Sequence, residues 1–331
     1  MEVLIEYGLF LAKTITVVVS ILVIVGGIIA LVSRSHPKAK GSIEIKHLNR
    51  DYEDMACSLQ AILLAKKDFK QVLKSRKKRH KQRGEKPRIF VLNFHGDIRG
   101  AAVSSLRKEI TAILTVANPQ DEVMLRLESA GGLVNAYGLA ASQLLRIKDK
   151  KIKLTVAIDK VAASGGYMMA CVADRIIAAP FAIVGSIGVV AQLPNFNRLL
   201  KKNDIDFEQF TAGEYKRTVT LFGENTDKAR EKFREELEDV HLLFKDFVKT
   251  HRSHLDIATV STGEYWYGKR ALAVNLVDEL RTSDDHLLEA SKEADLFEVA
   301  YTSKHPLMEK FFSFANNALT RHPLSPPFEY R

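Results

Sequence analysis

The feature that most constrains this 331-residue chain is a run of 20 residues without a charged side chain, from Thr14 to Ser33. At about 1.5 Å per residue, a helix of that length spans roughly 30 Å, the thickness of the bilayer's hydrocarbon layer. A cleaved signal peptide would have a shorter apolar core and a basic leader, whereas Glu2 and Glu6 precede this run. A buried core helix rarely lacks polar residues on every face. The sequence therefore predicts a transmembrane anchor at 14–33 behind a leader at 1–13.

The net charge of +9 is concentrated in one segment. Residues 34–88 hold 17 Lys or Arg and 6 Asp or Glu, a net of +11, so the remainder of the chain sums to −2. A nucleic-acid-binding domain would carry such an excess within its fold, and no nucleic-acid partner is therefore expected. We interpret 34–87 as a basic, partly helical linker. It either attracts anionic lipid headgroups, at about 1 kcal/mol per basic residue, or is a solvated spacer.

The basic residues near the predicted span lie almost entirely on its C-terminal side. Lys13 precedes the span, and Arg34, Lys38, Lys40 and Lys46 follow it. The positive-inside rule therefore places the C-terminal bulk of the chain in the cytoplasm.

Beyond the linker, apolar runs typical of strands alternate with amphipathic helical patterns. This alternation predicts βαβ units and a mainly parallel sheet, an α/β fold. We expect one folded domain at 88–300, with a long charged helix at 226–250 and another helix at 266–280, and a poorly defined tail at 301–331. The expected strands are 88–95, 123–127, 153–158 and 175–179, and the expected helices between the first three strands are 103–114 and 133–147.

Two glycine-rich turns follow expected strands, at the sheet edge where α/β proteins place their chemistry. Gly131-Gly132 follows the second strand, and Ser164-Gly165-Gly166 follows the third. A serine at a strand-to-helix turn presents its hydroxyl beside unpaired backbone N–H groups, which suit a developing oxyanion. Taken alone, however, Ser164 is better interpreted as a helix N-cap. The Gly pair lacks a following Gly-Lys-Ser/Thr, which excludes a phosphate-binding P-loop.

A nucleophilic serine needs a base, and the usual histidine is missing from the centre of the chain. No histidine lies between His95 and His241, and Ala162 occupies the first glycine position of the hydrolase motif GxSxG. A distant histidine such as His241 or His254 could fold back towards Ser164, but we expect both to lie on an exposed, highly charged helix. Lysine is the remaining class of base, and it functions when burial lowers its pKa.

Four segments, in their order and spacing, resemble the signal peptide peptidase A family of serine peptidases, and most closely its SohB branch. The resemblance extends from the anchor to about residue 282. It implies the crotonase/Clp-protease type of α/β domain. The segments are Leu127-Glu-Ser-Ala-Gly-Gly132, Val161-Ala-Ala-Ser-Gly-Gly-Tyr167, Val184-Gly-Ser-Ile-Gly-Val189 and Ala212-Gly-Glu-Tyr-Lys-Arg217.

The resemblance also implies the roles of individual residues and requires no metal or cofactor. Taken alone, a lysine flanked by charged residues would be a surface side chain, and only the matched segment points to Lys216. The implied roles are Ser164 as nucleophile, Lys216 as general base, the N–H groups of Gly165 and of one glycine in Gly131-Gly132 as the oxyanion hole, and Ser186 as the side chain that orients the lysine.

Two positions depart from the family's pattern. Ala130 replaces a proline before the glycines, which loosens the turn but keeps its N–H donors. Asn275 replaces a glycine before Leu-Val-Asp, and because asparagine tolerates a positive φ, a helix C-cap survives there.

In relatives of this length the lysine is expected to meet the serine of a neighbouring protomer, which implies a homo-oligomer. A single chain would then hold Ser164 and Lys216 too far apart for a hydrogen bond. The implied activity is endopeptidase cleavage, through an acyl-enzyme, of signal-peptide-like or unfolded segments at the bacterial inner membrane. The family's role is usually assigned to the outer side of that membrane, whereas the charge asymmetry favours the cytoplasm. Two alternatives remain open: a non-catalytic membrane scaffold, and a crotonase-type hydratase or isomerase with paired carboxylates.

Overall fold

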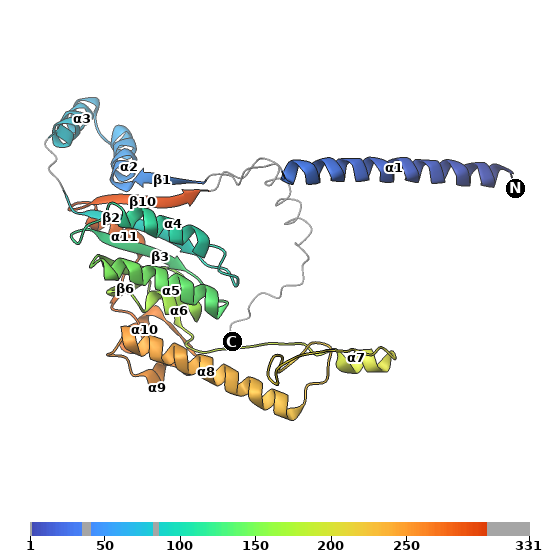
Figure 1. Cartoon of the computed structure of the whole chain (residues 1–331). Helices are drawn as coiled ribbons and strands as arrows, with labels where there is room; N and C mark the ends of the chain where they lie inside the picture. Colours follow the sequence, from blue (N-terminus) through green and yellow to red (C-terminus); the bar gives the residue numbers. More distant parts are fainter. Residues whose placement is uncertain (1, 35–40, 82–85, 303–331) are drawn as a thin grey trace. The chain divides into compact units, whose positions relative to one another are not determined.

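The computed structural model describes residues 2–34, 41–81 and 86–302 (Figure 1), with the backbone only at 2–4, 22–34 and 77–81. The chain divides into two compact units. One comprises residues 1–42 and 302–331, and the other comprises 43–301. Most of the expected tail, 303–331, lies outside the described residues.

In the first unit, α1 (Glu2–Arg34) is a single helix that contains the predicted anchor. The hydroxyls of Thr14, Thr16 and Ser20 each donate to a backbone carbonyl one turn back, so the helix itself satisfies these three side chains. Among the described residues, no helix combines the length and the apolarity of a membrane span. The side chains of 22–33, the larger part of the predicted anchor, lie outside that description.

The second unit is built on a sheet of seven strands in the order β1-β10-β2-β3-β4-β6-β9. Every neighbouring pair from β10 to β9 is parallel, which confirms the predicted α/β fold with a mainly parallel sheet. The strands are β1 (Ser42–His47), β2 (Arg88–His95), β3 (Glu122–Glu128), β4 (Lys153–Ile158), β6 (Arg175–Ala178), β9 (Glu279–Leu280) and β10 (Asp295–Thr302).

Side-chain alternation along the strands divides the core between the two faces of the sheet. Phe90, Leu92 and Phe94 of β2 pack in the larger cluster with α4 (Val103–Leu114), α5 (Val134–Asp149) and α6 (Gly165–Ala170). Ile89 and Val91 point to the other face, where α11 (Ser283–Ala290) and the start of α2 (Leu48–Leu63) cover them. The predicted helices at 103–114 and 133–147 are confirmed as α4 and α5.

The predicted linker is partly built into the fold. Residues 43 onward belong to the second unit, and α2 and α3 (Lys66–Lys81) account for the expected helical content. Asn49 is buried; its amide donates to the carbonyls of Ser291 and Ala294, and its oxygen accepts from Leu296 N–H. A buried amide that binds three backbone groups anchors this segment to the sheet. The parts of the linker at 35–40 and 82–85 lie outside the described residues.

Two helices were predicted in the C-terminal part of the domain, one correctly and one wrongly. Helix α8 (Asp227–His251) confirms the long charged helix. The single helix predicted at 266–280 is wrong, because the segment comprises part of β8 (Tyr265–Tyr267), then α10 (Gly268–Ala273) and β9. Asn275 has φ +60°, which ends the helix as the sequence suggested, and Asp278 then accepts from the N–H of Ile176 on β6.

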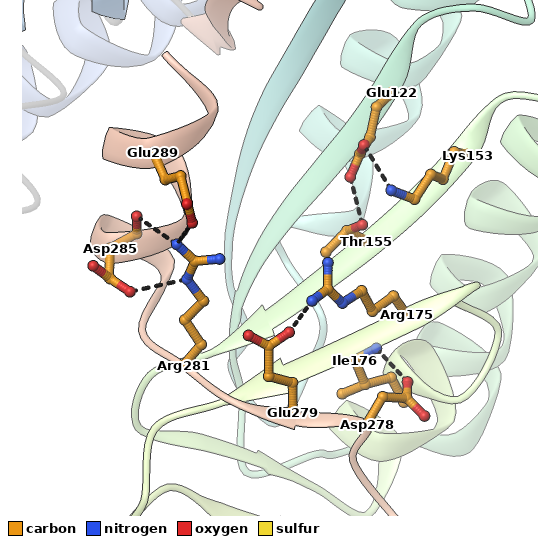
Figure 2. Close-up of polar contacts among 10 residues, drawn as sticks. All are labelled: Glu122, Lys153, Thr155, Arg175, Ile176, Asp278, Glu279, Arg281, Asp285 and Glu289. Carbon is orange, nitrogen blue, oxygen red and sulfur yellow. Dashed lines mark hydrogen bonds and ion pairs between the residues drawn. The ribbon is translucent and has the colours of Figure 1, made fainter. Parts of the chain in front are cut away.

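Polar contacts join the strands to α11 on one side of the sheet (Figure 2). Side chains link β3 to β4 and β6 to β9, and Arg281, which follows β9, is linked to α11. Glu122 accepts from Lys153 and Thr155, Arg175 pairs with Glu279, and Arg281 pairs with Asp285 and Glu289.

Candidate active site

A small second sheet places two serines side by side. Strands β5 (Val161–Ala163) and β7 (Ile183–Gly185) are parallel, with Ala163 opposite Gly185, and β8 pairs antiparallel with β7. Ser164 and Ser186 each follow the last paired residue of their strand. Ser164 N–H donates to Gly185 O at 2.8 Å. The structure therefore brings the predicted nucleophile and the predicted supporting serine together.

Ser164 lies at a sharp turn between β5 and α6 and has an unusual backbone conformation. Its φ is +52° and its ψ is −120°, outside the regions that L-residues ordinarily occupy. Such strained conformations cluster at functional sites. A strained strand-to-helix turn is also the geometry of the hydrolase nucleophile elbow, so the geometry is present although the GxSxG motif is not.

The Gly131-Gly132 turn packs directly against this serine. Gly131 has φ +92°, and a Cβ added there would lie 2.8 Å from both Ser164 Cβ and Gly165 N. Ser129 holds the turn in place, because its N–H donates to Val161 O at 2.9 Å and its carbonyl accepts from Ala163 N–H at 3.0 Å. Two loops far apart in sequence therefore meet at Ser164, and glycine is required for the close approach.

The backbone N–H groups around Ser164 are unequal in their availability. Gly131 N–H donates to Ser129 Oγ at 3.1 Å, and Leu133 N–H donates to Ile98 O at 2.8 Å. Within the part of the chain that the structure describes, the N–H groups of Gly132 and Gly165 make no hydrogen bond. These two donors are therefore available to an oxyanion, whereas Gly131 shapes the turn.

Lys216 is not part of this cluster in the single chain. It lies between α7 (Asn197–Lys202) and α8, its side chain is exposed, and its N–H donates to Gly213 O at 3.2 Å. It lines a pocket of about 660 Å³ together with apolar side chains that include Phe210 and Phe222. No hydrogen bond joins Lys216 to Ser164, both of which are described, and the pairing of the two residues stays a prediction.

The segment that carries Lys216, residues 189–226, also exposes many large apolar side chains. Figure 1 shows α7 within this segment, outside the layered body of the domain. Val190 is 81% exposed and Phe210 is 90% exposed. Monomeric proteins rarely leave so many apolar side chains in water, and such surfaces mark interaction sites. The others are Leu193, Phe196, Leu199, Ile205, Phe207, Tyr215, Leu221 and Phe222.

Other side chains that could act as a base, a nucleophile or a metal ligand were located in the described residues. His241 lies on α8, and its Nε2 is 3.2 Å from Ile187 O; no hydrogen bond links it to Ser164, and both residues are described. Burial raises the pKa of the Cys171 thiol, which suits a packing role rather than a nucleophilic one. In the described ranges, no group of three or more His, Cys, Asp or Glu side chains is placed to hold a metal ion.

Sequence reasoning missed Tyr137, which lies on α5 beneath the two glycine loops. Its side chain is fully buried, its hydroxyl is 2.6 Å from Ser129 Oγ, and the hydroxyl donates to Asp97 O at 2.8 Å. A tyrosine in an amphipathic helix gives no signal of its own, because it satisfies the apolar pattern. The only available signal was Ser129, a polar residue at the end of a buried strand.

The sequence matches two family profiles, Peptidase family S49 N-terminal over residues 2–144 and Peptidase family S49 over residues 146–297. A "Probable protease SohB" of Haemophilus influenzae is 50% identical over 327 residues, which cover 94% of this chain and 92% of that protein. A "Probable protease SohB" of Buchnera aphidicola is 46% identical, with 97% and 96% covered.

A solved structure of a membrane-bound stomatin-specific protease mutant with a substrate peptide is 13% identical. It has a TM-score of 0.44, with 71% of this chain and 100% of that chain covered. This likeness is too low to support any statement about the site. The two profiles and the full-length relatives are sufficient, and this chain belongs to peptidase family S49.

Proposed function

We propose that this chain is a membrane-anchored serine endopeptidase in which Ser164 is the nucleophile and Lys216 the general base. The observation that carries the proposal is the strained backbone of Ser164, with φ +52°, beside the uncommitted N–H groups of Gly132 and Gly165. A hydroxyl, a strained turn and two free backbone donors together suit acyl transfer. They have no obvious purpose in a non-catalytic scaffold.

The proposed reaction has two stages. Lys216 takes the proton of Ser164 Oγ as this oxygen attacks the peptide carbonyl, and the N–H groups of Gly132 and Gly165 bind the resulting oxyanion. Collapse of the tetrahedral intermediate breaks the C–N bond, and the lysine returns the proton to the leaving amine. Water, deprotonated by the same lysine, then hydrolyses the acyl-enzyme and regenerates the Ser164 hydroxyl.

The lysine of this pair comes from a second copy of the chain. In the single chain Lys216 is exposed, no hydrogen bond joins it to Ser164 among the described residues, and it lies in the apolar 189–226 segment. A lysine acts as a base only when its ammonium form is desolvated, which an exposed position does not provide. Packing of this segment against a neighbouring protomer would bury its apolar side chains and the lysine together. Ser186, which follows β7 where β7 pairs with β5 just before Ser164, would accept a hydrogen bond from the arriving amine.

The surface beside Gly132 favours an apolar peptide as substrate. Ile98 is 74% exposed and Leu133 is 52% exposed, and a hydrogen bond between their backbones holds them next to the glycine turn. An extended apolar segment would bury both side chains, each at about 25 cal/mol per Å². This environment supports signal-peptide-like or unfolded membrane-proximal segments as substrates.

A serine-directed fluorophosphonate tests the nucleophile and the base together. Wild-type protein should be labelled, Ser164→Ala should not, and Lys216→Ala should be labelled about 10²–10⁴-fold more slowly, the usual contribution of a general base. Ser142→Ala, an exposed serine on α5, is the matched control and should label normally. Labelling that persists in Ser164→Ala would overturn the proposal and favour the alternative function, a non-catalytic membrane scaffold.

The anchor and its orientation have a separate test. We expect the chain to remain in bilayers after alkaline carbonate washing, because 14–33 is apolar and uncharged. A fluorescent reporter fused after residue 331 should fold in the cytoplasm, since basic residues follow the predicted span. An alkaline phosphatase reporter at the same point should be inactive. High phosphatase activity would place the domain on the opposite side of the inner membrane.

A further inference from the structure

We infer that Tyr137 and Ser129 are positioning residues that hold the glycine turn beside Ser164 in its oxyanion-binding form. The inference rests on the proposed peptidase function. It begins from four groups in series: Gly131 N–H, Ser129 Oγ, Tyr137 OH and Asp97 O, separated successively by 3.1, 2.6 and 2.8 Å. Ser129 and Tyr137 are both buried, so water does not compete for these bonds.

The direction of each hydrogen bond follows from the last acceptor. The carbonyl of Asp97 can only accept, so the single hydroxyl hydrogen of Tyr137 is committed to it. Ser129 must therefore donate its own hydrogen to the Tyr137 oxygen, which leaves a Ser129 lone pair for Gly131 N–H. Burial raises the pKa of Tyr137, so the hydroxyl keeps its proton throughout the neutral range.

This relay determines which backbone donor of the turn stays free. Gly131 N–H is bound by Ser129 on one side, and Leu133 N–H is bound by Ile98 O on the other. Gly132 therefore lies between two residues whose N–H groups are hydrogen-bonded. Of the three N–H groups, only that of Gly132 makes no hydrogen bond to a described residue. Loss of the relay would release Gly131, and the peptide between the two glycines could then rotate.

The ring of the same tyrosine also contacts the second donor. A Cβ added to Gly165 would lie 2.5 Å from Tyr137 Cγ, so the ring packs closely against this glycine. The hydroxyl of Tyr137 thus acts on the turn at Gly132 through Ser129, and the ring supports Gly165 directly. Glycine is required at position 96 for the same reason, since a Cβ there would lie 2.4 Å from the Tyr137 hydroxyl.

The test compares the kinetics of Tyr137→Phe, Ser129→Ala and the double variant, in full-length protein in detergent with a quenched fluorescent apolar peptide. Each single variant should lower kcat at least about 10-fold, with KM changed less than about twofold. The loss should stay smaller than the 10²–10³-fold decrease that follows complete removal of an oxyanion donor. The double variant should lose no more than the worse single variant, because both break one relay.

Tyr167→Phe is the matched control. Tyr167 is equally buried, and its hydroxyl donates to a backbone carbonyl, Leu276 O, at 3.0 Å rather than to a residue of the glycine turn. We expect a similar loss of thermal stability in Tyr167→Phe with kcat unchanged. If Tyr137→Phe and Ser129→Ala lower kcat no more than Tyr167→Phe does, the inference is wrong. If wild-type cleavage is absent, or survives Ser164→Ala, the proposed function itself has failed.

Discussion

Mixing two inactive variants should restore peptidase activity. Ser164→Ala keeps the lysine and Lys216→Ala keeps the serine, so each alone should lose nearly all activity. If the lysine of one protomer serves the serine of the next in a head-to-tail ring, random assembly of equal amounts leaves about one quarter of the sites intact. Activity in the mixture should therefore return to about one quarter of the wild-type value. The physical reason is that the described structure of the single chain shows no hydrogen bond between Ser164 and Lys216, and the Lys216 side chain is exposed.

The mixing experiment distinguishes an inter-chain site from an intra-chain one. A dyad completed within each chain would give no recovery at any mixing ratio, and the oligomer proposal would then be wrong. The double variant Ser164→Ala/Lys216→Ala, mixed with wild type, is the control for nonspecific stabilisation. Phe210→Asp in the exposed segment should prevent both assembly and recovery, because a charge would be buried in an apolar contact. Sedimentation or light scattering would measure that loss of assembly.

The sequence was sufficient to predict the four adjacent inner strands β2, β3, β4 and β6, because most of their residues are buried, but it missed β1 and β10 at one edge of the same sheet. Residues 153–158 and 175–178 are short apolar runs between turns, and no local pattern competes with their assignment as strands. Short strands such as β5, β7 and β9 were missed for the opposite reason. Three residues such as Ile183–Gly185 provide no periodicity, and their strand conformation depends on partners that are remote in sequence.

The candidate site was predictable in its residue types but not in its hydrogen bonds. The Ser-Gly-Gly and Gly-Gly turns could be placed at the carboxyl ends of strands from the alternation alone. The identity of the free glycine N–H group could not be predicted, because it depends on whether Ser129 and Ile98 accept hydrogen bonds from the neighbouring N–H groups. Asn49 is a second example. From the sequence alone, an amide side chain in a charged segment is expected to be solvated, and its three backbone partners become evident only in the structure.

The largest effect on stability is expected from the ion pair between Arg252 and Asp278. Arg252 ends α8 and is only 4% exposed; its guanidinium binds both carboxylate oxygens of Asp278, at 2.7 and 3.0 Å. Asp278 also accepts from Ile176 N–H at 2.7 Å (Figure 2), so the pair joins α8 to β6. Asp278→Asn would leave a buried cation without its counter-charge, and should cost about 3–5 kcal/mol in the free energy of unfolding.

The losses of stability in the two single variants should differ, because Arg252 is more deeply buried than Asp278. Arg252→Met leaves a half-buried carboxylate that still binds Ile176 N–H, so its cost should be smaller than that of Asp278→Asn. The double variant should recover part of the loss, since neither charge is then left alone. Arg230→Met, which breaks the exposed pair with Asp227, is the control and should change stability by less than about 0.5 kcal/mol. Urea unfolding with a fluorescence readout measures all four.

The same pair should make the wild-type protein sensitive to acid. Burial disfavours the charge of Asp278, but hydrogen bonds from Arg252 and Ile176 N–H outweigh that cost and lower its pKa. A lowered folded-state pKa stabilises the fold above the unfolded value of about 3.9, and this contribution disappears as the pH falls through the folded-state value. The stability of Asp278→Asn should therefore fall less steeply than wild type below about pH 4, because Asn has no proton to gain. Parallel curves for the two proteins between pH 5 and 2 would show that the pair contributes nothing to acid unfolding.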